Sequence, residues 1–240
     1  MGGSGEALTR AIGLVDVGGL LTRDGQPLDE FQLPLAWPAE LARACGLGEP
    51  HGLATVIRAL RPTVLIGACG EGGAFGVDVV RAMAAGVERP VILPLSNPTS
   101  QSEAVPSDLI EWTEGRALVA AGSPFDPVVH GGRPIRIGQC NNAFIFPGLG
   151  LGILVAEARE VTDRMFRAAA ECLAGEVSAD ELRDGILYPR IRDLRRVSTR
   201  IALAVTREAG DSGVGRRLEG DALDRAVARA QWRPEYHPLG

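Results

Sequence analysis

The segment PVILPLSNPTS, residues 90–100, joins a short apolar run to a polar loop that contains a further proline, Pro98. A short, continuous apolar run is typical of a strand that is buried on both faces of a parallel sheet. Similar runs occur at 62–67 and 117–120, and stretches with helical periodicity separate the three. We therefore expect an α/β domain with a doubly wound parallel sheet that contains these three strands.

Polar groups follow the central strand directly, with Ser96 and Asn97 as its first loop residues. A second amide-rich segment, QCNNAFIFPG at 139–148, places Asn142 just before another apolar stretch, where it could also cap a helix that begins near Pro147. A carboxamide offers donors and an acceptor at fixed geometry without carrying charge. Asn97 and Asn142 could therefore hold a carboxylate, a hydroxyl or a ribose, and we predict that their loops converge at one rim of the sheet.

A further strand is expected at residues 12–16, where it ends in Asp16. An acid at this place fits the residue that binds ribose hydroxyls in dinucleotide-binding folds, where a strand and a glycine-rich turn precede it by about twenty residues. Here only Gly2, Gly3 and Gly5 stand before it, with no strand ahead of them. We expect a Rossmann-like domain over 12–146 that lacks its first strand and glycine-rich turn, after a flexible leader at 1–11.

The pattern becomes helical after residue 146, so a C-terminal helical segment packed on the sheet domain is expected over 147–240. Helices are predicted at 148–158, 162–173, 191–208 and 221–230. Another helix is predicted to begin at Ser178, because the spacing from Ser178 to Glu181 is that of a capping box. Because a missing central strand would leave unpaired edges in the sheet, we expect a longer protein, a partner or a rearrangement of the sheet to fill the gap.

Composition excludes several classes of function. The formal net charge of -5 argues against nucleic acid as a partner, and no apolar window is long enough to span a membrane. All 25 basic residues other than histidine are arginine, so the chain has no lysine for amine chemistry. The four cysteines lack the spacing of a zinc site, and a cytoplasmic location with reduced thiols is expected.

The segments 95–100 and 139–148, with GSPFDP at 122–127 between them, resemble the malic enzyme family, and most closely its NAD-linked bacterial branch. Further pieces, LIG at 65–67 and LYP at 187–189, fall in the family's order. The resemblance implies the C-terminal NAD-binding region of an enzyme that converts L-malate to pyruvate and CO2 while reducing NAD, with Mg2+ or Mn2+.

The resemblance also implies roles for single residues. It assigns substrate contacts to Asn97 and Asn142. The residues that it implies for the cofactor are Asp16, Gln32, Ala68, Cys69, Gly70, Ser96 and Asn97. Gln32 takes the place of a lysine that NADP-using members place near the 2′-phosphate, and a neutral amide cannot offset that charge. NAD is therefore favoured over NADP.

In the family, the general-acid tyrosine, the general-base lysine and the metal-binding carboxylates lie upstream of the region present here. No catalytic residue and no metal ligand is therefore expected on this chain, which we do not expect to be active alone. Its expected partners are the missing N-terminal catalytic half or a full-length subunit, with a homo-oligomer in the complete enzyme. One alternative is a truncated paralogue that acts as a dinucleotide-binding or regulatory subunit without catalysis, and another is a decayed reading frame.

Overall fold

The computed structural model describes residues 10–25, 27–47 and 51–232, so the first nine residues of the predicted leader lie outside it. The chain divides into two compact units, the first ending at Ile137 and the second beginning at Gly138. The predicted division between residues 146 and 147 falls within the second unit. Each unit is described by itself.

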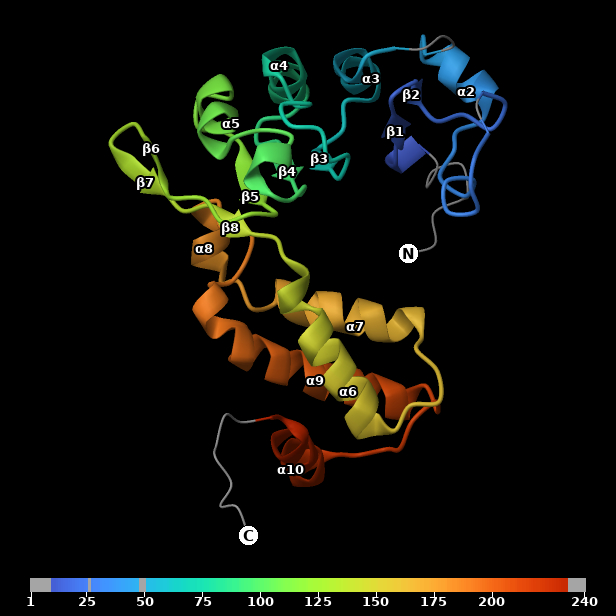
Figure 1. The fold of residues 1–240 in the computed structure, drawn as a ribbon, viewed down its shortest axis with the longest axis vertical. Helices are drawn as coiled ribbons and strands as arrows, with labels where there is room; N and C mark the ends of the chain where they lie inside the picture. The colour runs from blue at the N-terminus through green and yellow to red at the C-terminus, as the bar shows by residue number, and fades with distance from the viewer. Residues whose placement is uncertain (1–9, 26, 48–50, 233–240) are drawn as a thin grey trace. The chain divides into compact units, whose positions relative to one another are not determined.

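The first unit contains a parallel sheet in which β3 (Val64–Gly67), β4 (Val91–Pro94) and β5 (Leu118–Ala121) lie in that order. Val64 pairs with Val91, and Val91 pairs with Leu118. Helix α3 (Leu53–Leu60) precedes β3, while α4 (Val77–Gly86) and α5 (Pro106–Trp112) make the two crossovers (Figure 1). The three predicted strands and the Rossmann-like α/β class are confirmed.

One face of this sheet forms the core of the unit. Leu65, Ile92 and Val119 belong to one buried cluster with side chains from α3, α4 and α5, among them Ile57, Val80, Met83 and Leu109. Successive side chains of a strand point to opposite faces. Accordingly Val64 and Ile66 point away from this cluster, and they are 43% and 60% exposed. Strand β3 therefore presents apolar side chains outside the core.

The prediction of a strand over 12–16 in the parallel sheet is wrong in both extent and pairing. The structure has β1 (Val15–Asp16) paired antiparallel with β2 (Gly19–Leu20) in a separate two-stranded sheet. Val17 and Gly18 separate the two strands, and Gly19, the first residue of β2, adopts φ +99°, which glycine reaches without steric cost. A short helix, α2 (Ala39–Ala44), follows, and Trp37 before it is buried and donates from Nε1 to the carbonyl of Ile12 at 2.7 Å.

A second hairpin, β6 (Val128–His130) with β7 (Arg133–Ile135), was not predicted. Gly131 and Gly132 form its turn with φ of +57° and +75°. Two consecutive residues with positive φ make the type I′ turn that suits the twist of antiparallel strands. A Gly-Gly pair between two β-rich runs is the sequence signal that identifies such a turn.

The second unit is helical, as expected. Its elements are β8 (Gly138–Gln139), η2 (Asn142–Phe144), α6 (Phe146–Ala156), α7 (Asp163–Ala174), α8 (Ala179–Arg183), η3 (Ile191–Asp193), α9 (Leu194–Asp211) and α10 (Gly220–Ala230). The capping box predicted at Ser178 is present, with Glu181 as its partner. Helix α9 packs against α6, α7 and α10 (Figure 1). Within the part of the chain that is described, no helix is both long and apolar enough to cross a membrane.

Candidate functional site

The loops that follow β3 and β4 lie together at the carboxyl edge of the parallel sheet. Ala68, Cys69 and Gly70 come directly after β3 and are exposed. The backbone N–H of Gly70 donates to Oγ of Ser96, in the loop after β4, at 2.9 Å. The structure therefore brings these predicted cofactor residues into one cluster. The carboxyl edge of a parallel sheet is the usual position for ligand sites in open α/β folds.

Asn97 is held from the loop after β5. Its Oδ1 accepts a hydrogen bond from Ser123 Oγ at 2.6 Å, and its Nδ2 donates to the carbonyl of Leu95 at 3.2 Å. Gly122 makes this approach feasible, because a Cβ there would lie 2.1 Å from the carbonyl oxygen of Leu95 and 2.9 Å from Asn97 Nδ2. Since a carboxamide has further donor and acceptor capacity, the exposed Asn97 side chain is oriented but not saturated.

Glu103 was missed at the level of sequence, although it lies within the same polar cluster. It is fully buried, and its carboxylate accepts hydrogen bonds from Ser96 and Cys69. Burial acts to raise the pKa of Glu103, but the hydrogen bonds from the Ser96 hydroxyl and from backbone amides outweigh it. The pKa of this carboxyl therefore lies below its ordinary value. An acid seven residues after Ser96 has no local pattern that marks it as buried.

The hydrogen bonds of Asp16 and Gln32 go to residues outside this cluster. Oδ1 of the exposed Asp16 accepts from the backbone of Val17 at 2.8 Å. Oε1 of Gln32 accepts from the backbone of Asp29 at 3.2 Å, while Asp29 Oδ1 accepts from the backbone of Gln32 at 2.7 Å. Each side chain thus hydrogen-bonds to a backbone amide close to it in the sequence. Their contacts with a cofactor stay predictions.

Asn142 lies in the second unit, at the start of η2. The neighbouring Asn141 caps this turn, because its Oδ1 accepts from the backbone of Ala143 at 2.9 Å. The expectation that Asn142 caps a helix near Pro147 is therefore wrong, and Asn141 has the capping role one turn earlier. The Asn142 side chain is exposed. Its convergence with Asn97 stays a prediction.

Ligands for a metal ion do not gather in the described ranges, where no three His, Cys, Asp or Glu side chains lie close enough to hold one. These residues therefore do not fit a Mg2+ or Mn2+ centre by themselves. The cysteines are free, and Cys69 is exposed. Partial desolvation raises the pKa of the Cys69 thiol, and the adjacent Glu103 carboxylate raises it further.

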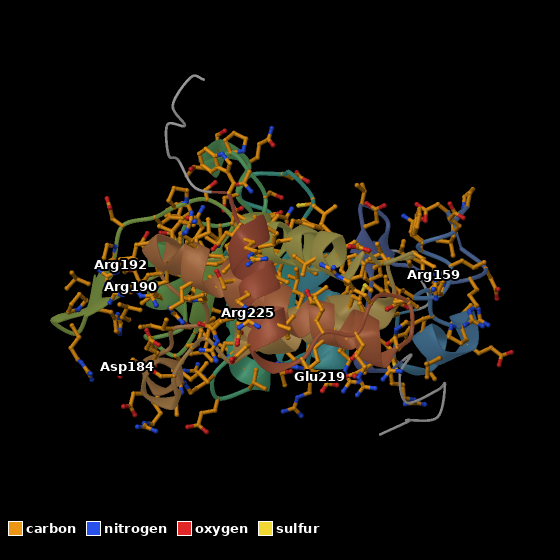
Figure 2. The ribbon with its side chains drawn as sticks, turned by 90° about the horizontal axis from the view of Figure 1, so that it is seen from below. Arg159, Asp184, Arg190, Arg192, Glu219 and Arg225 are labelled. Atoms are coloured by element: carbon orange, nitrogen blue, oxygen red, sulfur yellow. The ribbon has the colours of Figure 1, made fainter. Side chains whose placement is uncertain are left out.

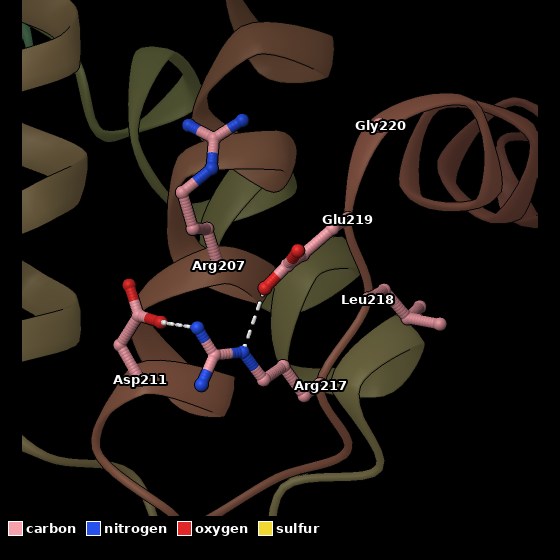
Figure 3. Close-up of a pocket in the computed structure, with 6 residues that line it drawn as sticks. All are labelled: Arg207, Asp211, Arg217, Leu218, Glu219 and Gly220. Atoms are coloured by element: carbon pink, nitrogen blue, oxygen red, sulfur yellow. Dashed lines mark hydrogen bonds and ion pairs between the residues drawn. The ribbon is translucent and has the colours of Figure 1, made fainter.

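A small hollow in the second unit lies between the end of α9 and the start of α10 (Figure 3). It is lined by Arg207, Asp211, Arg217, Leu218, Glu219 and Gly220. Arg217 is already ion-paired with Glu219 at 2.7 Å and Asp211 at 3.8 Å, and Arg207 extends away from this pair. Because its two acids balance its two arginines, the hollow has no excess charge that would favour an ionic ligand.

Arginines near the start of α9 mostly stabilise the second unit. Arg196 and Arg200 both pair with Glu176, whose side chain is 1% exposed, and Arg195 donates to the carbonyl of Trp232 at 3.0 Å. Arg192 is exposed and projects from the surface near Arg190 (Figure 2). This group of arginines is therefore partly structural.

A parallel α/β sheet with polar loops gathered at its carboxyl edge defines a domain of the nucleotide-binding class. The family model described as "Malic enzyme, NAD binding domain" matches residues 1–210. The chain belongs to this family. It corresponds to the NAD-binding region of a malic enzyme, as the sequence resemblance implies.

Curated relatives extend this match over nearly the whole chain. It is 45% identical to "NAD-dependent malic enzyme 3" of Bacillus subtilis (strain 168) over 228 residues, which are 94% of this chain and 40% of that protein. It is 42% identical to "NAD-dependent malic enzyme" of Acinetobacter baylyi over 233 residues, 96% of this chain and 41% of that protein. The chain thus spans about 40% of the length of these relatives.

Solved structures agree on the fold. The malic enzyme from Pyrococcus horikoshii OT3 superposes with a TM-score of 0.63 at 25% identity, covering 88% of this chain and 43% of that one. The malic enzyme of Entamoeba histolytica gives a TM-score of 0.64 at 20% identity, covering 90% and 41% respectively, and supports the fold alone.

Proposed function

We propose that this chain is the cofactor-binding part of a malic enzyme that converts L-malate to pyruvate and CO2 while reducing NAD, and that it needs a second polypeptide region for catalysis. The observation that carries this proposal is the cluster at the carboxyl edge of the sheet, where hydrogen bonds join the loops after β3, β4 and β5. NAD, when bound, supplies the acceptor for the hydride that leaves malate.

The chain's own contribution is binding and orientation. Ala68, Cys69 and Gly70 form an open, largely backbone surface after β3, which suits close approach by a nucleotide. Ser96 and Asn97 provide the adjacent polar wall, and Ser123 fixes the orientation of the Asn97 carboxamide. Asn142 offers a second carboxamide for a substrate carboxylate, and Asp16 and Gln32 are proposed to meet the adenosine side, with Gln32 favouring NAD over NADP.

The missing half is proposed to complete the sheet as well as the chemistry. Strands of parallel sheets are usually covered on both faces, yet β3 exposes Val64 and Ile66 and is the end strand of its sheet in the described region. A strand added along β3 would pair its free edge and bring the glycine-rich turn that the cofactor requires. The same region would bring the proton-transfer groups and the carboxylates that bind Mg2+ or Mn2+.

Complementation tests this proposal directly. The purified chain is assayed for malate-dependent NADH formation with NAD and Mn2+, alone and after mixing with the part of the Bacillus subtilis relative that this chain does not match. We expect no activity above background from the chain alone and measurable turnover from the mixture. Turnover by the chain alone would refute the proposal that the catalytic groups lie outside this chain. An inactive mixture whose parts associate would refute the enzymatic role.

Calorimetry with NAD distinguishes the enzymatic role from the second hypothesis, a dinucleotide-binding or regulatory subunit without catalysis. Binding of NAD by the chain, combined with association but no turnover, favours a dinucleotide-binding or regulatory subunit. Absence of NAD binding both alone and in the mixture excludes both functions.

A variant at Val64 and Ile66, each changed to Ser, should weaken association with the added region, because both side chains lie on the exposed side of β3.

A further inference from the structure

Glu103 brings a buried carboxylate into the polar cluster. Its exposed fraction is 0%. A buried carboxylate is strongly unfavourable unless hydrogen bonds satisfy it. Here the donors to its carboxylate come from the ends of two strands, because Cys69 follows β3 and Ser96 follows β4. The residue therefore joins two loops that are far apart in the sequence.

The contacts divide between the two carboxylate oxygens. Oε1 accepts from the backbone N–H of Cys69 at 3.0 Å and from Ser96 Oγ at 2.5 Å, and it lies 3.4 Å from Cys69 Sγ. Oε2 accepts from the backbone N–H of Ser96 at 3.2 Å. Ser96 Oγ also accepts from the backbone N–H of Gly70 at 2.9 Å, so this hydroxyl connects Glu103 to Gly70, the residue after Cys69.

The end of β3 is shaped to admit this side chain. A Cβ at Gly67 would lie 2.6 Å from Cδ and 2.7 Å from Cγ of Glu103, and 2.7 Å from Cζ of Phe75. The backbone N–H of Phe75 donates to the backbone carbonyl of Glu103 at 2.9 Å, so the backbone of Glu103 is held in place as well. Glycine at position 67 and the buried carboxylate therefore form one arrangement.

We propose that Glu103 is a positioning residue of the nucleotide site, whose carboxylate clamps the loop after β3 to the loop after β4 and so sets the spacing of the groups that meet the dinucleotide. This inference rests on the proposed function. Glu103 is buried beneath the exposed residues 68–70 and acts through Cys69, Gly70 and Ser96. Hydrogen bonds to a charged acceptor are about twice as strong as neutral ones, which suits a clamp between loops that are otherwise open to solvent.

The test compares Glu103→Gln with Glu111→Gln, a matched change at an exposed acid of α5. Amide signals of the 15N-labelled chain report the clamp, and calorimetry on the chain mixed with the added region of the Bacillus subtilis relative reports NAD affinity. In the Glu103→Gln variant we expect the amide signals of Cys69 and Ser96 to shift, their hydrogen exchange to accelerate at least tenfold, and NAD affinity to fall at least fivefold. The Glu111→Gln change should alter none of these.

Ser96→Ala and Ser96→Thr provide a second pair in case the Glu103→Gln variant does not fold. Loss of the hydroxyl should reproduce the faster exchange at Gly70 and the weaker NAD binding, and threonine, which keeps the hydroxyl, should restore both. Unchanged amides, or changed amides with unchanged NAD affinity, would overturn the positioning role alone. Failure of the unmodified chain to bind NAD both alone and in the mixture with the added region would instead overturn the proposed function, and the positioning role with it.

Discussion

Two glycines set the distance between the central helices of the second unit, and replacing either should destabilise it. Gly148 and Gly152 lie one turn apart on α6 and face α9. A Cβ at Gly148 would lie 2.7 Å from Ile201 Cβ and 2.7 Å from the carbonyl oxygen of Ser198. A Cβ at Gly152 would lie 2.7 Å from Val205 Cβ and 2.8 Å from the carbonyl oxygen of Ala202.

The expected magnitude follows from two opposing effects. Alanine is favoured over glycine inside a helix by about 1 kcal/mol. Overpacking a tight interface costs about 1–3 kcal/mol, and the upper part of this range applies because the opposing atoms include helix carbonyls that cannot rotate away. Gly152→Ala should therefore lower the free energy of unfolding by about 1–2 kcal/mol. Thr206, which donates to the Gly152 carbonyl at 3.1 Å, should lose this contact as the helices separate.

Gly150 supplies a control of opposite sign on the same helix. A Cβ at this position would meet nothing within 4 Å, so Gly150→Ala should raise the free energy of unfolding by about 1 kcal/mol. Urea unfolding followed by far-UV circular dichroism measures both changes. If Gly152→Ala is as stable as Gly150→Ala, the close approach of α6 and α9 does not explain the glycines.

Three further predictions concern the candidate site. Ser123→Ala removes the donor to Asn97 and should cost about 1 kcal/mol in urea unfolding, with a changed Asn97 side-chain amide signal; an unaltered signal would contradict the bond. Asn142→Ala in the complemented enzyme should raise KM for malate more than KM for NAD, and equal effects would exclude its substrate role. Because the folded-state pKa of Glu103 lies below 4.5, the stability that its carboxylate provides is complete above that pH and is lost as the pH falls through the lowered pKa. As the pH falls through this lowered pKa, the urea midpoint of unfolding should therefore decrease less for Glu103→Gln than for the unmodified chain. Parallel plots of urea midpoint against pH for the two proteins would refute this.

The parallel strands were predictable because their signal is local. Residues 64–67, 91–94 and 118–121 are short apolar runs bounded by turn residues, and burial in a parallel sheet requires that composition. The family resemblance assigns Gly70 and Ser96 to one cofactor site, and the structure brings them together because parallel strands end at the same edge. The helices of the second unit were predictable for a similar reason, since their periodicity and the cap at Ser178 are contained within single segments.

The features that sequence missed depend on pairing between distant segments. The apolar composition of residues 12–16 is compatible with a parallel strand, but the chain turns back at Val17 and Gly18, and residues 19–20 pair antiparallel with residues 15–16 instead. Glu103 is similar, because nothing around it in the sequence distinguishes a buried acid from an exposed one. Its burial becomes favourable through the approach of Cys69 and Ser96 from separate loops.

The loop after β4 is the central part of the candidate site because its two consecutive polar residues serve different neighbours. Ser96 hydrogen-bonds toward Glu103 and the loop after β3, whereas Asn97 hydrogen-bonds toward Ser123 and the loop after β5. The close packing at Gly122 leaves no space for the loop to shift without disturbing the second linkage. A change of register by one residue would therefore break both linkages together, which explains why two small polar residues must stand side by side at the end of this strand.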